Sequence, residues 1–181
     1  MSSMILSGDT SGAITVTVPA VAGTNTITLP AATGTVLVSG NQPTFNYYQS
    51  VAQTLTTGTT TKITFTSSNF DTTSGMFASS RFTPTIAGYY QINTNVTLTL
   101  GSTTGLRACY IYKNGTQYAA GSTSNGYTGD YSTSSVSSVI YCNGSTDYIE
   151  VYAYQNSGGN LATIAGSTGW TSISASLVRA A

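Results

Sequence analysis

The sequence contains no histidine and few charged side chains, with five Lys or Arg and five Asp or Glu among 181 residues. Enzymes that move protons need titratable groups whose pKa values suit the reaction, so this composition favours a non-enzymatic protein. The basic residues are scattered, whereas neutralising phosphate groups requires clusters of Lys and Arg. We therefore expect no binding to nucleic acid or to a membrane surface, and no cofactor.

Long apolar runs and metal-binding patterns are missing as well. No stretch reaches the roughly 18 apolar residues of a membrane span, and the first residues show no secretory signal. Cys109 and Cys142, the two cysteines, lack the spacing of metal ligands and have no histidine partner. Both lie in apolar strand patterns, which favours buried free thiols, with a disulfide between them as the alternative. No bound metal is expected.

The acidic residues do not form a catalytic pair. Glycoside hydrolysis generally requires two carboxyl groups at a defined separation across the sugar. Asp147 and Glu150 stand three residues apart in an expected strand, so their side chains should point to opposite faces of the sheet. This spacing argues against a glycan-degrading enzyme.

What the sequence has in abundance is alternation of polar with apolar residues, together with 13 Tyr and many Thr, Ser and Gly. No segment shows apolar residues at helical spacing over 11 or more residues, whereas residues 61–65, 91–100 and 172–178 alternate as strands do. Many short strands predict an all-β antiparallel sandwich or barrel. The side chains expected to point inward are Ile92, Val96, Leu98, Leu100, Ile149, Val151, Ala153, Ile173, Ala175 and Leu177.

Two Asn-Gly pairs predict hairpins. Asn114-Gly115 lies inside the strand pattern of residues 108–120, and Asn143-Gly144 lies inside that of residues 134–155. Asn-Gly favours the positive φ angles that tight hairpin turns require. The second loop holds two further residues.

The first 42 residues form a separate domain in our interpretation. They contain one charged residue, Asp9, and no aromatic residue, and segment 13–23 recurs with a period of 11 as segment 24–34. In each unit the alternation breaks at Pro-Ala, where proline interrupts strand pairing. A ribbon of this size cannot bury a core alone, so it needs sibling arms or a larger body as a partner; a terminal linker is the alternative. The residues expected to anchor the arm are Ile14, Val16, Val18, Ile27, Leu29 and Val36.

A string in the middle of the chain, RFTPTIAGYYQI at residues 81–92, places an aromatic residue, a proline two residues later and then Gly-x-Tyr at the start of a long strand. Phe65 and the pair Asn69-Phe70 precede it, and a Lys-Asn-Gly turn follows at residues 113–115. In this order, the motifs resemble those of the globular head of complement first component q and its tumour-necrosis-factor-like relatives, over about residues 45–181.

This resemblance implies a two-sheet antiparallel jelly roll for residues 43–181 and a homotrimer around a threefold axis. The turn before Tyr148 is two residues longer than in the family pattern, and few carboxylates are available for the calcium sites of some relatives. No collagen-like stalk precedes the head, so the host-defence branch of the family is not expected.

The arm carries a second resemblance. The string VPAVAGTNTITLPAATGTV at residues 18–36 is similar to segments of structural proteins of tailed bacteriophages, where they precede fibre or decoration domains. The two resemblances together imply a virion structural protein, exposed on the capsid or tail and made in the host cytoplasm. The expected partners are sibling chains and a major capsid protein or a tail or baseplate protein.

Within that class the short arm favours a trimeric capsid decoration (cement) protein, because 40 residues without a repeated stalk cannot span the length of a fibre. The rival hypothesis is a short tail fibre or fibre tip that binds host-surface glycans through Gly/Ser/Tyr loops. The residues proposed for those loops are Tyr127, Asp130, Tyr131, Asn156 and Asn160.

Tyrosine suits a trimer interface because it combines a large apolar area with a polar hydroxyl group. The alternative is that the tyrosines only coat the outer face of one sheet. Trp170 is expected to fill a core or interface position rather than to bind sugar. The candidates for the trimer interface are Tyr148, Tyr152, Tyr154, Tyr90 and Trp170.

Overall fold

The computed structural model contains two compact units, residues 1–34 and 35–181, whereas the sequence interpretation divides the chain at residue 42. The described part has no helix long and apolar enough to cross a membrane. The residues that the structure describes are 3–7, 9–21, 23–26, 36, 38, 40, 42–73, 75–99, 105–121, 124–125, 131–167 and 169–181.

The first unit contains a two-stranded antiparallel ribbon, β1 (Ser3–Ser7) and β2 (Ala13–Thr17). Met4 stands opposite Val16 and Leu6 stands opposite Ile14 in its register. Residues directly opposite each other share a face of an antiparallel pair, so these four side chains form one apolar face.

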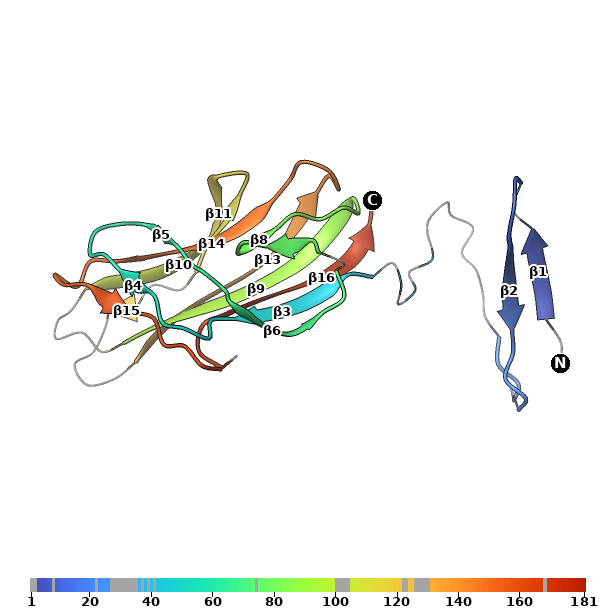
Figure 1. Cartoon of the computed structure of the whole chain (residues 1–181), viewed down its shortest axis with the longest axis horizontal. Helices are drawn as coiled ribbons and strands as arrows, with labels where there is room; N and C mark the ends of the chain where they lie inside the picture. The colour runs from blue at the N-terminus through green and yellow to red at the C-terminus, as the bar shows by residue number, and fades with distance from the viewer. Residues whose placement is uncertain are drawn as a thin grey trace. The chain divides into compact units, whose positions relative to one another are not determined.

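The second unit packs two antiparallel sheets against each other (Figure 1). One sheet has five strands in the order β13-β9-β16-β3-β6. The other has the order β11-β10-β14-β8-β7, with β5 also paired to β14 and β12 to β10. The five-stranded sheet contains β3 (Thr44–Tyr48), β6 (Ser67–Asp71), β9 (Gly88–Leu98), β13 (Ser132–Cys142) and β16 (Ser172–Ala180).

The seven-stranded sheet is built mostly from short strands around the long pair β10 and β14. A further two-stranded pair is formed by β4 (Thr54–Leu55) and β15 (Leu161–Ala162). The strands of the seven-stranded sheet are β5 (Thr61–Lys62), β7 (Phe77–Ala78), β8 (Arg81–Phe82), β10 (Leu106–Lys113), β11 (Thr116–Ala120), β12 (Ser124–Asn125) and β14 (Ile149–Gln155).

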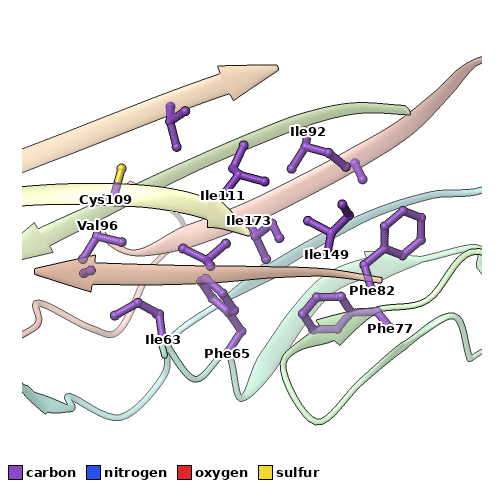
Figure 2. Packing of buried hydrophobic residues seen from close by; sticks show 14 of the residues in the cluster. Ile63, Phe65, Phe77, Phe82, Ile92, Val96, Cys109, Ile111, Ile149 and Ile173 are labelled. Carbon is purple, nitrogen blue, oxygen red and sulfur yellow. The ribbon is translucent and has the colours of Figure 1, made fainter. Parts of the chain in front are cut away.

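The core lies between the two sheets and is aromatic at one end. The Phe45 ring packs 4.8 Å from that of Phe77 and 5.0 Å from that of Phe82, between ring centroids, and Phe82 lies 5.1 Å from Tyr90. Aliphatic side chains from both sheets continue the core (Figure 2). The predicted inward positions are confirmed wherever the structure describes them, and Leu100 lies outside the described residues. The confirmed positions are Ile92, Val96, Leu98, Ile149, Val151, Ala153, Ile173, Ala175 and Leu177.

The two predicted hairpins have different outcomes. The one over residues 108–120 is confirmed, because β10 pairs with β11 and both Asn114 and Gly115 have positive φ. The one over residues 134–155 is wrong: β13 pairs with β9, β14 pairs with β10, and the two strands belong to different sheets. The loop between them carries the chain from one sheet to the other.

Gly144 in this crossing loop gives a test of the fold. Its φ is +73°, and a Cβ atom built on it would lie 2.4 Å from the backbone nitrogen of Ala87. We expect Gly144→Ala to lower the free energy of unfolding by about 3 kcal/mol, since backbone strain and a clash act together. Urea denaturation of the purified protein measures this loss.

Gly158→Ala is the matched control, because Gly158 has φ +87° but nothing lies within 4 Å of the position that a Cβ atom would take there. Only the cost of the backbone conformation applies at this position, about 1 kcal/mol. Equal losses for the two variants would contradict the close packing of the crossing loop against Ala87.

Candidate functional site

The ribbon exposes its apolar face. Met4, Leu6, Ile14 and Val16 are each about half exposed or more, and so are the anchoring candidates Val18 and Val36. The other two predicted anchoring residues, Ile27 and Leu29, lie outside the described residues. A two-stranded ribbon with four exposed apolar side chains on one face is a surface that a partner can cover.

The outer face of the five-stranded sheet is polar and uncharged over most of its length. Ser137 Oγ donates to Asn93 Oδ1 at 2.7 Å, and Ser172 Oγ donates to Asn95 Oδ1 at 2.7 Å. A shallow groove of about 480 Å³ runs over these residues. Its outward-facing polar lining is Asn93, Asn95, Thr133, Ser135, Ser137, Ser172 and Ser174.

Aromatic residues stand at both ends of this face, and the exposed Arg179 lies opposite Tyr89 at one of them. Tyr89 and Tyr141, paired across β9 and β13, are exposed with ring centroids 5.4 Å apart. Trp170 packs edge-on against Tyr131, also at 5.4 Å, and both rings are partly exposed. The face thus joins a neutral amide and hydroxyl surface to two aromatic patches.

The outer face of the seven-stranded sheet differs in character. Tyr110 and Tyr112 of β10 lie beside Tyr152 and Tyr154 of β14, and the rings of Tyr112 and Tyr152 pack with centroids 4.3 Å apart. Glu150 lies on the same face and binds two cationic side chains. Burial raises the pKa of Glu150, but hydrogen bonds from those cations outweigh it and hold the pKa below its usual range.

The second carboxylate, Asp147, organises the crossing loop. It accepts hydrogen bonds from Asn114 Nδ2 at 2.7 Å and from Asn143 N at 2.9 Å, and it pairs with Lys113 at 2.9 Å. The hydrogen bond from Asn114 is the main reason why the pKa of Asp147 lies below its usual value. Asp147 and Glu150 therefore each belong to a separate ionic cluster.

The two thiols are free and buried, as their strand patterns predict, with Cys109 on β10 and Cys142 on β13. Burial raises the pKa of Cys109 to about 12 and that of Cys142 to about 11. Thiols are nucleophilic as thiolates, so neither is active at neutral pH. In the described ranges, no group of three or more His, Cys, Asp or Glu side chains is placed to hold a metal ion.

The trimer-interface candidates do not gather in one place. Tyr148, Tyr152 and Tyr154 belong to the seven-stranded side, and Trp170 lies beside the groove on the other sheet. Tyr90 is a correction: its ring is fully buried in the core, its hydroxyl donates to the carbonyl oxygen of Ile86 at 2.8 Å, and it cannot reach a partner.

The residues proposed for ligand-binding loops also lie in different surroundings. Asn156 Oδ1 accepts from the backbone of Leu106 at 2.6 Å, and Asn160 Oδ1 accepts from that of Thr57 at 3.3 Å, so both side chains hold loops in place. Tyr131 packs on Trp170. The other two candidates, Tyr127 and Asp130, lie outside the described residues. Sequence reasoning missed the ionic cluster around Glu150, for which the sequence carries no local signal.

Solved structures resemble the second unit, whereas no family model and no curated protein matches the chain. The globular domain of zebrafish complement 1qA protein aligns with 77% of this chain and 99% of its own length, at 12% identity and a TM-score of 0.54. Murine APRIL aligns with 76% of this chain and 99% of its own length, at 11% identity and a TM-score of 0.55. The Eiger TNF of S. frugiperda aligns with 77% of this chain and 94% of its own length, at 6% identity and a TM-score of 0.54. The head is thus a two-sheet jelly roll of the C1q and TNF type, as the motifs predict.

The ionic clusters predict how stability depends on pH. Three carboxyl groups, Asp71, Asp147 and Glu150, have lowered pKa values in the folded protein. The unfolded chain therefore binds more protons in acid, so stability is present above the usual carboxyl pKa and is lost as pH falls through the lowered values. We expect the urea concentration at the unfolding midpoint to drop below about pH 4 and to stay nearly constant from about pH 6 to 8. It should drop again at higher pH, because thiols of the unfolded chain ionise there while the buried Cys109 and Cys142 stay protonated.

Glu150→Gln separates the contribution of the largest cluster. Unfolding free energies at pH 7 and pH 3 should differ less in this variant than in the unmodified protein. Asp9→Asn, which changes an exposed carboxylate in the ribbon unit, should leave the difference for the head unchanged. An unchanged acid loss in Glu150→Gln would show that this carboxylate has the same pKa in the folded and unfolded states.

Proposed function

We propose that this protein is a non-enzymatic structural component of a tailed-phage particle, a trimeric capsid decoration protein whose ribbon anchors it and whose head is displayed on the virion surface. The observation that carries the proposal is the ribbon, an apolar surface attached to a head that has a complete core of its own. The buried thiols and the ion-paired carboxylates support a role without catalysis.

Anchoring follows from the energetics of the ribbon. Covering an exposed Leu, Ile or Val side chain contributes about 1.5–3 kcal/mol, so the apolar face of Met4, Leu6, Ile14 and Val16 can supply substantial binding free energy. Isolated two-stranded ribbons are marginal in water. A capsid or tail subunit, or sibling ribbons resting on it, would complete the missing layer.

The five-stranded sheet supports the trimer. The cores of protein interfaces are depleted in charged residues, and the described residues along the groove on this face carry no charge. Tyr89 and Tyr141 add apolar area at one end, and Trp170 adds it at the other. Three copies that each bury part of this face would close a ring under cyclic symmetry.

The oligomeric state tests this arrangement. Three chains of 18.6 kDa should give a particle of about 56 kDa in sedimentation or light-scattering measurements. Asn93→Arg places a charge in the groove and should release monomers, because a buried unpaired charge is costly. Gln117→Arg, on exposed β11 of the other sheet, should leave the mass unchanged. A monomer for the unmodified protein would contradict the trimer.

The ribbon has an equally direct test in the virus that encodes the protein. Leu6→Ser combined with Ile14→Ser removes half of the apolar face and should reduce incorporation into purified particles at least about tenfold. Ile5→Ser is the matched control, since Ile5 is exposed on the opposite face of the ribbon. Equal incorporation of all the variants would rule out anchoring through this face.

Labelling the protein in electron micrographs of virions shows whether it lies on the capsid or on the tail. For a decoration protein, virions that lack it should lose resistance to heat or osmotic shock while they still adsorb to cells. A fibre-tip adhesin is the second candidate, favoured by the hydroxyl and amide groove, which a monomeric head would leave open to a host glycan. In that case the mutant virions should be stable and should fail to adsorb.

A further inference from the structure

Three of the few charged side chains meet on the outer face of the seven-stranded sheet. Glu150 Oε1 accepts hydrogen bonds from Lys62 Nζ at 2.7 Å and from Arg81 Nε at 2.8 Å. Its other oxygen accepts from the Tyr152 hydroxyl at 3.1 Å. The Glu150 side chain is 4% exposed, whereas those of Lys62 and Arg81 are 31% and 45% exposed. One carboxylate neutralises only one of the two cations, so the cluster keeps a net positive charge at the surface.

Arg81 is held at two points and keeps donors to spare. Its Nε is bonded to Glu150, and its guanidinium carbon lies 4.0 Å from the centroid of the Tyr148 ring. Within the described part of the chain, no acceptor engages its two terminal amino groups. Those groups belong to a rigid planar fork that matches the two oxygens of a carboxylate. The surface therefore presents a guanidinium that is already ordered for an anionic ligand.

Aromatic surface adjoins this guanidinium. Tyr112 packs against Tyr152 with ring centroids 4.3 Å apart, and Tyr110 lies edge-on to Tyr112 at 6.5 Å. All three rings are half-buried, so each keeps part of its surface open to solvent. Partly exposed tyrosines combine apolar area with hydroxyl groups that can hydrogen-bond. Such a surface suits a ligand that has both an apolar flank and many hydroxyl groups.

We propose that this face, made of Lys62, Arg81, Tyr112, Tyr148 and Tyr152, binds a saccharide that carries a carboxylate. The sugar carboxylate accepts two parallel hydrogen bonds from Arg81, and the C–H flank of the sugar ring lies on the tyrosines. A phosphate dianion fits less well, because Glu150 already occupies Lys62 and the Nε of Arg81. An acidic peptide side chain would use the arginine alone and leave the aromatic surface without a role.

The site goes beyond the proposed function, since anchoring and trimer formation use the ribbon and the opposite sheet. Failure of saccharide binding would leave the oligomeric state and particle incorporation unaffected. Conversely, a monomeric or unincorporated protein could still bind the saccharide. The two proposals can therefore fail separately.

The test titrates the full-length protein with sialyllactose, with a disaccharide that ends in glucuronic acid and, for comparison, with neutral lactose. Isothermal titration calorimetry should give a Kd of about 1 mM or tighter for at least one acidic saccharide, and lactose should bind at least about tenfold more weakly. Arg81→Gln should weaken acidic-saccharide binding at least about tenfold. Arg81→Lys should weaken it as well, because it keeps the charge but loses the fork.

Two further variants make the result specific. Arg179→Gln changes an exposed arginine on β16 of the other sheet and should leave the Kd unchanged. Tyr112→Ser leaves the ionic cluster intact, so it tests the site even if the Arg81 variants fail to fold. It should weaken saccharide binding about threefold or more.

Several outcomes would overturn the proposal. They are the absence of binding by both acidic saccharides at about 10 mM, equal Kd values for acidic saccharides and lactose, and full binding by Arg81→Gln. A glutamate-rich peptide that bound as tightly as the saccharides, with no effect of Tyr112→Ser, would instead assign the face to a protein partner.

Discussion

The structure depends on one constraint, the burial of every second side chain of the long strands between two facing sheets. Because successive side chains of a strand point to opposite faces, filling the core fixes one set of positions and leaves the other set free. Ile149, Val151 and Ala153 of β14 fill the core, whereas Glu150 and Tyr152 between them form the outer surface cluster. The composition of the outer faces of the head is thus a direct consequence of how its core is packed.

Local alternation can be read from the sequence, but pairing partners cannot. The Asn-Gly pair at 114–115 closes a hairpin because its flanking strands are neighbours, as predicted. The same pair at 143–144 begins a longer loop, which Asp147 ties to Asn143 and which packs Gly144 against Ala87, so the next strand enters the other sheet. An Asn-Gly pair permits positive φ angles, which both residues adopt at 114–115 and only the glycine adopts at 143–144. The pair leaves open which strand lies beyond the turn.

The position of a residue in the alternation predicts its burial better than its residue type does. As a tyrosine, Tyr90 suits an interface, yet it has the same position in the alternation as Ile92 and is buried with it. The cluster around Glu150 poses a different difficulty, because Lys62 and Arg81 lie 88 and 69 residues away along the chain. Contacts at such separations arise only when the sheet assembles, so inspection of short segments cannot reveal them.

The distribution of the few charges separates the two outer faces for which we propose different roles. Covering the neutral groove of the five-stranded sheet removes water from amides and hydroxyls. Hydrogen bonds to a second copy can replace the lost hydrogen bonds to water. Covering the other face would also strip water from Lys62 and Arg81, which share a single carboxylate, and the desolvation of ions is costly. The cost of desolvation therefore favours the neutral face for the self-association that we propose. In that proposed arrangement Arg81 and its neighbouring tyrosines stay in solvent, where the anionic saccharide that we propose would supply negative charge without a large dry interface.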